Sequence, residues 1–207
     1  MDLREMGKRA AAAKYQLQGL TTEEKNRALE HAAEALTEHT REILTANARD
    51  LDRGRENGMH QGLLDRLKLD QVRIAAMAQG LKQVAALPDP VGECLENFDR
   101  PNGLHIEKHR VPLGVIGIIY ESRPNVTADA FALCFKAGNA VILKGGSDAL
   151  ASNMAIAHVL QQALTDCGID RDAVQLITDT NRAVTTAFMR LKEYVDVLIP
   201  RGGAGLI

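Results

Sequence analysis

After residue 112 the sequence alternates short apolar runs with longer helical patterns, and this alternation restricts the fold more than any other feature. The runs "VIGIIY", "AVILK", "AVQLIT" and "YVDVLIP" are rich in β-branched residues and lack polar alternation. Such strands are typical of a parallel sheet that helices cover on both faces. We expect the intervening helices at about 126–136, 147–167 and 181–191, with Gly168 ending the second. The series predicts an open, right-handed, mostly parallel α/β sheet over residues 112–207.

The first 87 residues predict a helical lead-in to this sheet. Apolar residues recur at steps of three and four in the opening segment, the pattern of an amphipathic helix: Leu3, Met6, Ala10, Ala13 and Leu17. Thr21 and Glu24 have the spacing of a capping box before a second helix. A third helix is expected from about 40 to 57, ended by Gly58, and a fourth after Asp70.

The segment 91–111, between the helices and the sheet, predicts a projecting β-hairpin that is polar on at least one face. Two short extended runs flank the turn-rich "DRPNG". A hairpin of this kind needs a surface to pack on, either the rest of this chain or a second subunit. We therefore expect a homo-oligomer that forms through the hairpin.

Composition and charge argue against several classes of partner. A formal net charge of −2 with interspersed acids and bases predicts neither a nucleic-acid footprint nor binding to an anionic membrane. The three cysteines, Cys94, Cys134 and Cys167, are far apart and odd in number, which argues against a disulfide framework and a zinc knuckle. No stretch is apolar enough for a membrane span, and the charged first residues do not resemble a signal peptide. We expect a cytoplasmic protein without a bound metal.

Three loops at strand ends are candidate sites, because open α/β sheets bind ligands there. The first loop, "ESRPNVT", holds Ser122, Arg123 and Asn125. Asn125 or Thr127 can cap the following helix, and Arg123 is a bidentate donor that suits a carboxylate, a phosphate or a developing oxyanion. The alternative is that Asn125 is only a helix cap and Arg123 a solvated side chain.

The second loop is "LKGGSDA", in which Lys144 ends a strand. Gly145 and Gly146 allow close approach to a ligand, and Ser147 can cap the next helix. The loop suits a nucleotide ribose or phosphate, although it is not a P-loop. The alternative is a tight turn with an exposed lysine.

The third loop, "PRGGAG", places Gly202 and Gly203 between a strand and an expected helix. Such a turn suits a pyrophosphate or a nicotinamide, but it does not match G-x-G-x-x-G. A simple strand-end turn is the alternative.

No cysteine is a convincing nucleophile, because Cys134 lies among apolar residues and the other two lack a neighbouring histidine.

Two stretches, "RVPLGVIGIIYESRPNVTADAFALCFKAGNAVILKGGSDA" and "VDVLIPRGGAGLI", closely resemble the γ-glutamyl phosphate reductases, or glutamate-5-semialdehyde dehydrogenases, of the aldehyde dehydrogenase superfamily. "EKNRALEHAAEAL" and "LDRLKLD" are similar too, so the resemblance covers nearly the whole chain. It implies a Rossmann-like fold, here incomplete. It also implies an oxidoreductase of proline biosynthesis that reduces L-glutamyl 5-phosphate with NADPH to the semialdehyde and phosphate. In that family a cysteine thiolate displaces phosphate, and hydride transfer to the thioester releases the aldehyde.

The resemblance implies roles for single residues. The family asparagine that donates to the thioester oxyanion falls on Asn125, with Ser122 as the rival. The lysine that contacts the adenosine ribose or its 2′-phosphate falls on Lys144. Many NAD-preferring relatives carry a glutamate at the position of Ser147, and its replacement favours NADP. The "RGGAG" turn matches the pyrophosphate-side loop, and our hypothesis for Arg123 is a substrate carboxylate or phosphate.

The resemblance also predicts what this chain lacks. We expect the catalytic cysteine beyond residue 207, so that the chain is the N-terminal part of an NADP-binding domain and is inactive alone. Channelling of the substrate from glutamate 5-kinase is a further expectation. The alternative is a stand-alone, non-catalytic module that binds a nucleotide or a partner.

Overall fold

The computed structural model of the protein describes residues 2–203, which contain a four-stranded parallel sheet and a two-stranded hairpin. The order of the sheet is β5 (Val174–Leu176), β4 (Ala140–Lys144), β3 (Val115–Tyr120) and β6 (Val197–Arg201), so the chain crosses back over the sheet after β5. The predicted α/β class and parallel sheet are confirmed. Because Ile119 pairs with Lys144 and Tyr120 with Arg201, three strands end at the same edge.

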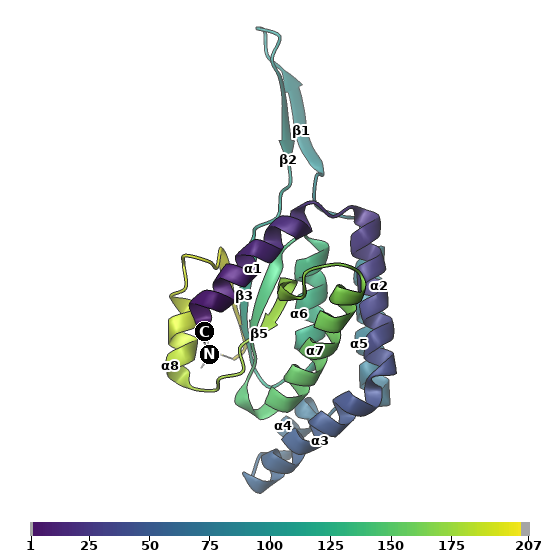
Figure 1. Ribbon diagram of the computed structural model, residues 1–207, viewed down its shortest axis with the longest axis vertical. Coiled ribbons are helices and arrows are strands. Elements are labelled where there is room, and N and C mark those ends of the chain that lie inside the picture. The colour runs from purple at the N-terminus through teal and green to yellow at the C-terminus, as the bar shows by residue number, and fades with distance from the viewer. Residues whose placement is uncertain (1, 204–207) are drawn as a thin grey trace.

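Helices cover both faces of the sheet (Figure 1). The helices α6 (Asn125–Lys136) and α7 (Leu150–Asp166) pack on one face, where Ile118 of β3 meets α6. Gly117 faces the other side, where an added Cβ would contact Phe188 of α8 (Arg182–Met189). On that second face, α1 (Leu3–Gln18) contacts the segment between α8 and β6 through Gly7. All residues of β3 and β4 are therefore buried, as their apolar runs predict.

The remaining helices form a layer outside the sheet. α2 (Thr22–Glu38) packs on α5 (Gln71–Ala86) and α7, and α3 (Thr40–Glu56) packs on α7 and α4 (Gln61–Leu67). The predicted capping box before α2 is confirmed, and Gly58 adopts a φ of +68° just after α3. The seven-residue helix α4 was missed because so short a segment shows no period. Within residues 2–203 no helix is both long and apolar enough to cross a lipid bilayer.

The predicted hairpin projects from the body as a separate arm (Figure 1). It consists of β1 (Cys94–Asp99) and β2 (His105–His109), paired antiparallel. One face is polar, because His105 and His109 both contact Glu107. Nearly every residue of both strands is exposed. The arm is thus free of the body along its length.

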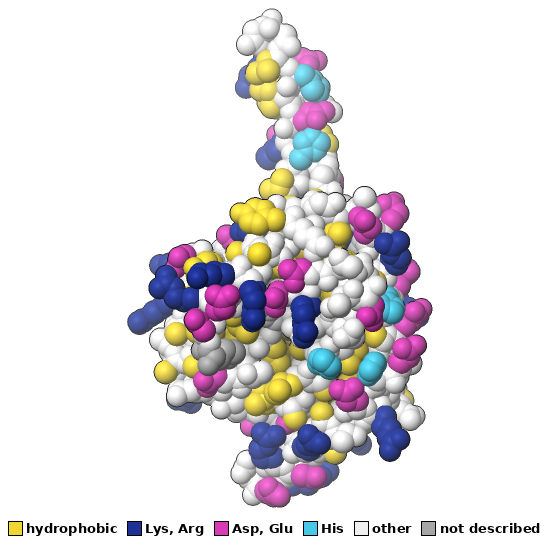
Figure 2. Space-filling view, viewed as in Figure 1, with side chains coloured by type: hydrophobic (Ala, Val, Ile, Leu, Met, Phe, Trp, Pro, Cys, Tyr) yellow, Lys and Arg dark blue, Asp and Glu magenta, His cyan; other side chains and the backbone are white. Residues whose placement is uncertain are grey.

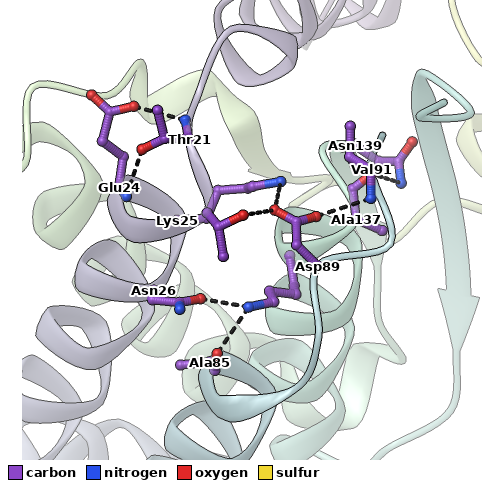
Figure 3. Close-up of polar contacts among 11 residues, drawn as sticks. Thr21, Glu24, Lys25, Asn26, Ala85, Asp89, Val91, Ala137 and Asn139 are labelled. Carbon is purple, nitrogen blue, oxygen red and sulfur yellow. Dashed lines mark hydrogen bonds and ion pairs between the residues drawn. The ribbon is translucent and has the colours of Figure 1, made fainter. Parts of the chain in front are cut away.

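Asp89 anchors the chain just before the hairpin (Figure 3). Its carboxylate forms an ion pair with Lys25 of α2 and accepts hydrogen bonds from the Thr22 hydroxyl at 2.9 Å and the Val91 backbone N–H at 3.0 Å. Burial alone would raise the pKa of Asp89, but these donors bring it below its ordinary value. The root of the arm is therefore tied to α2 by a largely buried charge.

A second buried lysine lies beside this anchor. Lys136, at the end of α6, donates to Asn26 Oδ1 and, at 2.8 Å, to the carbonyl of Ala85. Burial lowers the pKa of Lys136, while the nearby Asp89 carboxylate acts in the opposite direction. The ends of α5 and α6 are thus joined to the start of α2 by polar contacts.

The turn after β4 is closely packed against protein atoms. A Cβ added to Gly145 would overlap Asn153 Nδ2 and lie 3.1 Å from Tyr120 Cζ, and one on Gly146 would lie 2.8 Å from Ser122 Oγ. Both glycines are required by packing, so closeness to a ligand is not needed to explain them.

The prediction that Ser147 caps the helix after β4 is wrong. A short 3₁₀ turn, η1 (Ser147–Ala149), comes first, and α7 starts at Leu150. The cap comes from Asp50 of α3, which accepts from the backbone N–H groups of Ala151 and Ser152 at 3.2 and 2.7 Å. A side chain far away in the sequence thus does what the local cap was expected to do.

Asp89→Ala should destabilise the chain by about 3–5 kcal/mol, because it leaves the buried Lys25 ammonium unpaired. The double variant Lys25→Met/Asp89→Leu should lose less, since it removes both charges together. Urea unfolding measures both free energies. A double variant as unstable as Asp89→Ala would contradict the assignment of the loss to an orphaned charge.

Gly145→Ala should destabilise the chain by about 1–3 kcal/mol, because the methyl group overlaps Asn153. Gly203→Ala is the matched control and should change stability by no more than about 0.5 kcal/mol, since its Cβ would meet only Glu121 Oε1 at 3.5 Å. Thermal unfolding without ligand compares the two. Equal effects would show that the packing of the turn after β4 is looser than described.

Candidate functional site

The three predicted loops converge at the carboxyl edge of the sheet. Glu121 Oε1 accepts from the Gly203 backbone N–H at 2.7 Å, which joins the first loop to the third. Ser122 Oγ donates to Asp148 Oδ2 at 3.0 Å and lies against Gly146, which joins the first loop to the second. Segments that are far apart in the sequence therefore form one continuous surface.

Arg123 and Asn125 line a cavity of about 370 Å³ between this edge and the segment that joins α4 to α5. Ser122 is not part of its lining, because the serine hydroxyl points to Asp148 in the second loop. The two rivals for an oxyanion donor are thus placed differently, with Asn125 at the cavity and Ser122 against the second loop.

The prediction that Asn125 or Thr127 caps α6 is wrong. Pro124 occupies the cap position, and Asn125 is the first helical residue. Thr127 is buried and bonds to Tyr120 and Asn153 instead of to the backbone. Because proline fixes a helical φ and needs no N–H partner, it starts the helix without a side-chain cap.

Asp129, which sequence reasoning missed, fixes the amide of Asn125. Asn125 Nδ2 donates to Asp129 Oδ2 at 3.0 Å, one helical turn further on. An amide nitrogen carries two hydrogens, so the second remains available to a ligand. Burial raises the pKa of Asp129, whereas the Asn125 bond and the charge of Arg201 oppose the rise. The i, i+4 spacing of the two residues was the available signal.

Lys144 ends β4 as predicted, but it is buried, not exposed. Its ammonium donates to the Gly145 carbonyl at 3.2 Å. Burial lowers the pKa of Lys144, and the carboxylate of Asp179, in the loop after β5, acts in the opposite direction. Ser147 is exposed at the start of η1, and Gly202 and Gly203 are exposed after β6. Asp179 was not singled out from the sequence, although it too follows a strand.

The far wall of the cavity comes from the "LDRLKLD" stretch and the start of α5. Arg66, Lys68 and Arg73 line it together with Asp65. In the sequence analysis this stretch was noted only for its similarity to the family, and no site role was predicted for it. Nothing in the local sequence indicates that the segment faces the first loop. A neighbouring apolar cleft of about 590 Å³ lies between α5, α6 and β6, and Asp129 lines both spaces.

No activated thiol or metal centre is found in the part of the chain that the structure describes. Burial raises the pKa of Cys134 to about 12 and also raises that of Cys167. Cys94 is exposed on the hairpin arm. Among residues 2–203 no three His, Cys, Asp or Glu side chains are grouped to hold a metal ion.

Known proteins share the sequence and the fold of this chain. The profile of the aldehyde dehydrogenase family matches residues 1–199. The γ-glutamyl phosphate reductase of Heliobacterium modesticaldum is 55% identical over 201 residues, which make up 97% of this chain and 48% of that protein.

Two solved structures share the fold over the whole chain. The γ-glutamyl phosphate reductase of Thermotoga maritima has a TM-score of 0.98 at 45% identity, covering 100% of this chain and 50% of that one. The enzyme of Saccharomyces cerevisiae has a TM-score of 0.91 at 32% identity, covering 100% and 52%. The chain thus spans about half the length of the relatives it matches. It belongs to the aldehyde dehydrogenase family, and within that family it resembles the N-terminal portion of the γ-glutamyl phosphate reductases.

Proposed function

We propose that this chain forms the cofactor-binding portion of an NADPH-dependent reductase that converts L-glutamyl 5-phosphate to L-glutamate 5-semialdehyde and phosphate in proline biosynthesis. The observation that carries the proposal is the convergence of the three strand-end loops beside the cavity that Asn125 lines. The names of the relatives supply the substrate and the pathway.

The residues of the three loops fit a phosphorylated dinucleotide. A Cβ on Gly203 would meet only Glu121 Oε1, which accepts from the Gly203 N–H, so a bound pyrophosphate would take the place of this carboxylate. Lys144 is a partly desolvated cation, and an anionic ligand stabilises such a group. In this proposal Lys144 contacts the ribose or its 2′-phosphate, Ser147 adds no opposing charge, and Gly202 and Gly203 lie along the pyrophosphate. NADPH, when bound, supplies the hydride for the reduction.

The first loop handles the substrate in this proposal. The free N–H of Asn125 donates to the oxygen of the reacting carbonyl, and Asp129 keeps that amide in the correct orientation. Arg123 binds the phosphate next to that carbonyl. In this proposal the nucleophilic cysteine comes from the half of the enzyme that this chain does not span, since burial raises the pKa of Cys134 and Cys167, and Cys94 lies on the hairpin arm.

The hairpin joins two copies of the chain in this proposal. Phe98 and Ile106 are cross-strand partners on the face opposite to the histidines, and Phe98 is 40% exposed. Figure 2 shows apolar side chains along one side of the arm and histidine and acidic side chains along the other. An exposed apolar strip on a projecting arm is suited to a protein interface.

Calorimetric titration should show tighter binding of NADPH than of NADH to this 207-residue chain. Lys144→Ala should weaken NADPH binding by about tenfold or more, because a charge-assisted contact is lost, and should bring the two affinities together. Lys82→Ala, an exposed lysine on α5, is the control. Unchanged NADPH binding by a folded Lys144→Ala chain would remove the 2′-phosphate role.

The preference for NADPH should decline with rising pH below the ordinary pKa of lysine, 10.5, because burial lowers the pKa of Lys144 and the neutral amine no longer attracts a 2′-phosphate. Asp179→Asn should move this decline to lower pH, because it removes the carboxylate that opposes the lowering of the Lys144 pKa. The ratio of the two dissociation constants between pH 7 and 10 is the measurement. A ratio that is constant with pH would contradict the role of Lys144.

Phe98→Asp should convert a dimer into a monomer, because it places a charge in the apolar strip of the arm. Asn97→Asp, its neighbour on the polar face, should leave the dimer intact. Light scattering after gel filtration gives both masses. A wild-type chain that is a monomer at all concentrations, or a Phe98→Asp dimer, would contradict the proposed interface.

A further inference from the structure

The cavity that Asn125 lines carries positive charge that the contacts within the fold do not neutralise. Arg66, Lys68 and Arg123 line it, and none of their side chains makes an ion pair or hydrogen bond with any residue in the range 2–203. Asp65, one of the two acids in the lining, is already paired with Arg73. The other, Asp129, is engaged by Asn125. An anion in this space would therefore meet three unpaired cations.

Arg66 and Lys68 lie on a backbone segment that is fixed from two sides. Asn47 of α3, which is buried, donates to the Leu67 carbonyl at 2.9 Å and accepts from the Leu69 N–H at 2.8 Å. Its two bonds bracket Lys68. The backbone on both sides of Lys68 is therefore held by a buried side chain, as the supporting residues of a binding site would hold it.

Arg73 holds the same segment from the other side. Its guanidinium donates to the carbonyl of Asp65 and, at 2.6 Å, to that of Lys68. The two residues that flank Arg66 therefore both have a bonded carbonyl, Asp65 with Arg73 and Leu67 with Asn47. The backbone that carries the two cations is thus fixed before any ligand arrives, which reduces the part of the entropy loss that comes from ordering the segment.

We propose that Arg66 and Lys68 bind the α-carboxylate of an amino-acid substrate whose side-chain carbonyl reaches Asn125. This assignment rests on the proposed function. Arg123 is two residues from Asn125 and therefore lies near the reacting end, which leaves the opposite wall for the second anionic group of the substrate. A guanidinium and an ammonium together suit a carboxylate, and the size of the cavity suits a small molecule.

The test is a titration of the ¹⁵N-labelled 207-residue chain, followed by backbone amide shifts. L-glutamate is the probe, and γ-aminobutyrate, which has the same carbon chain without the α-carboxylate, is the matched comparison. L-glutamate should shift the amides of residues 65–69, and γ-aminobutyrate should bind about tenfold more weakly or worse. Arg66→Ala/Lys68→Ala should lose about the same factor for L-glutamate, while Lys82→Ala should not.

Each contrary result overturns the assignment. Equal binding of the two probes would show that the α-carboxylate is not recognised, and unchanged L-glutamate binding by Arg66→Ala/Lys68→Ala would place it elsewhere. Inorganic phosphate that shifts the amides of residues 65–69 and displaces L-glutamate would assign this wall to the phosphoryl end instead. NADPH titration of the same double variant separates this question from the proposed function, since the cofactor should still bind.

Discussion

Two buried polar side chains of α3 hold the separate parts of the site together. Asp50 caps α7, the helix that follows the Lys144 loop, and Asn47 holds the segment that presents Arg66 and Lys68. Ser152 links the two, because its hydroxyl donates to Asp50 at 2.7 Å and accepts from Asn47 at 3.0 Å. A buried carboxylate is tolerated only when hydrogen bonds replace water, and here the partial positive charge at the start of α7 helps as well.

Buried polar side chains also form hydrogen bonds with one another at the carboxyl edge of the sheet. Tyr120 ends β3 and is buried, and its hydroxyl bonds to Thr127 at 2.7 Å, which in turn donates to Asn153. Asn153 Nδ2 has no hydrogen-bond partner in residues 2–203, and it lies where the Gly145 turn packs most tightly. The close packing of the second loop against the first thus leaves the Asn153 amide N–H without a hydrogen-bond partner, which is uncommon for a buried polar group.

The root of the hairpin arm is held by a buried charge, in addition to the apolar side chains of Val91 and Pro112 that lie against Gly138. Two buried ammonium groups, Lys25 and Lys136, share the space around one carboxylate, Asp89. Neutral oxygens of Asn26 and the Ala85 carbonyl complete the coordination of Lys136. Such a root is directional, because hydrogen bonds fix orientation in a way that apolar contacts do not. It suits an arm whose strands have almost no other contact with the body.

The sequence by itself determined the order and type of most elements, the short helix α4 being the exception. Apolar runs without alternation required a covered parallel sheet, the Thr21–Glu24 spacing marked a helix start, and the turn-rich "DRPNG" marked the hairpin. It also indicated that the loops after β3, β4 and β6 are candidate sites, because open α/β sheets bind ligands at the ends of their strands. These features depend on local periodicity and local hydrogen bonding, which a single stretch of sequence contains.

Only the tertiary structure decided which side chains serve which part of the site. Asp50 replaced Ser147 as a cap, Asp129 took the amide of Asn125, and the wall carrying Arg66 and Lys68 came to face the first loop. The helical lead-in is far from the sheet in the sequence, and no local pattern records where it packs. Contacts between such distant segments are selected by the packing of the whole chain, so their partners became visible only once the chain was folded.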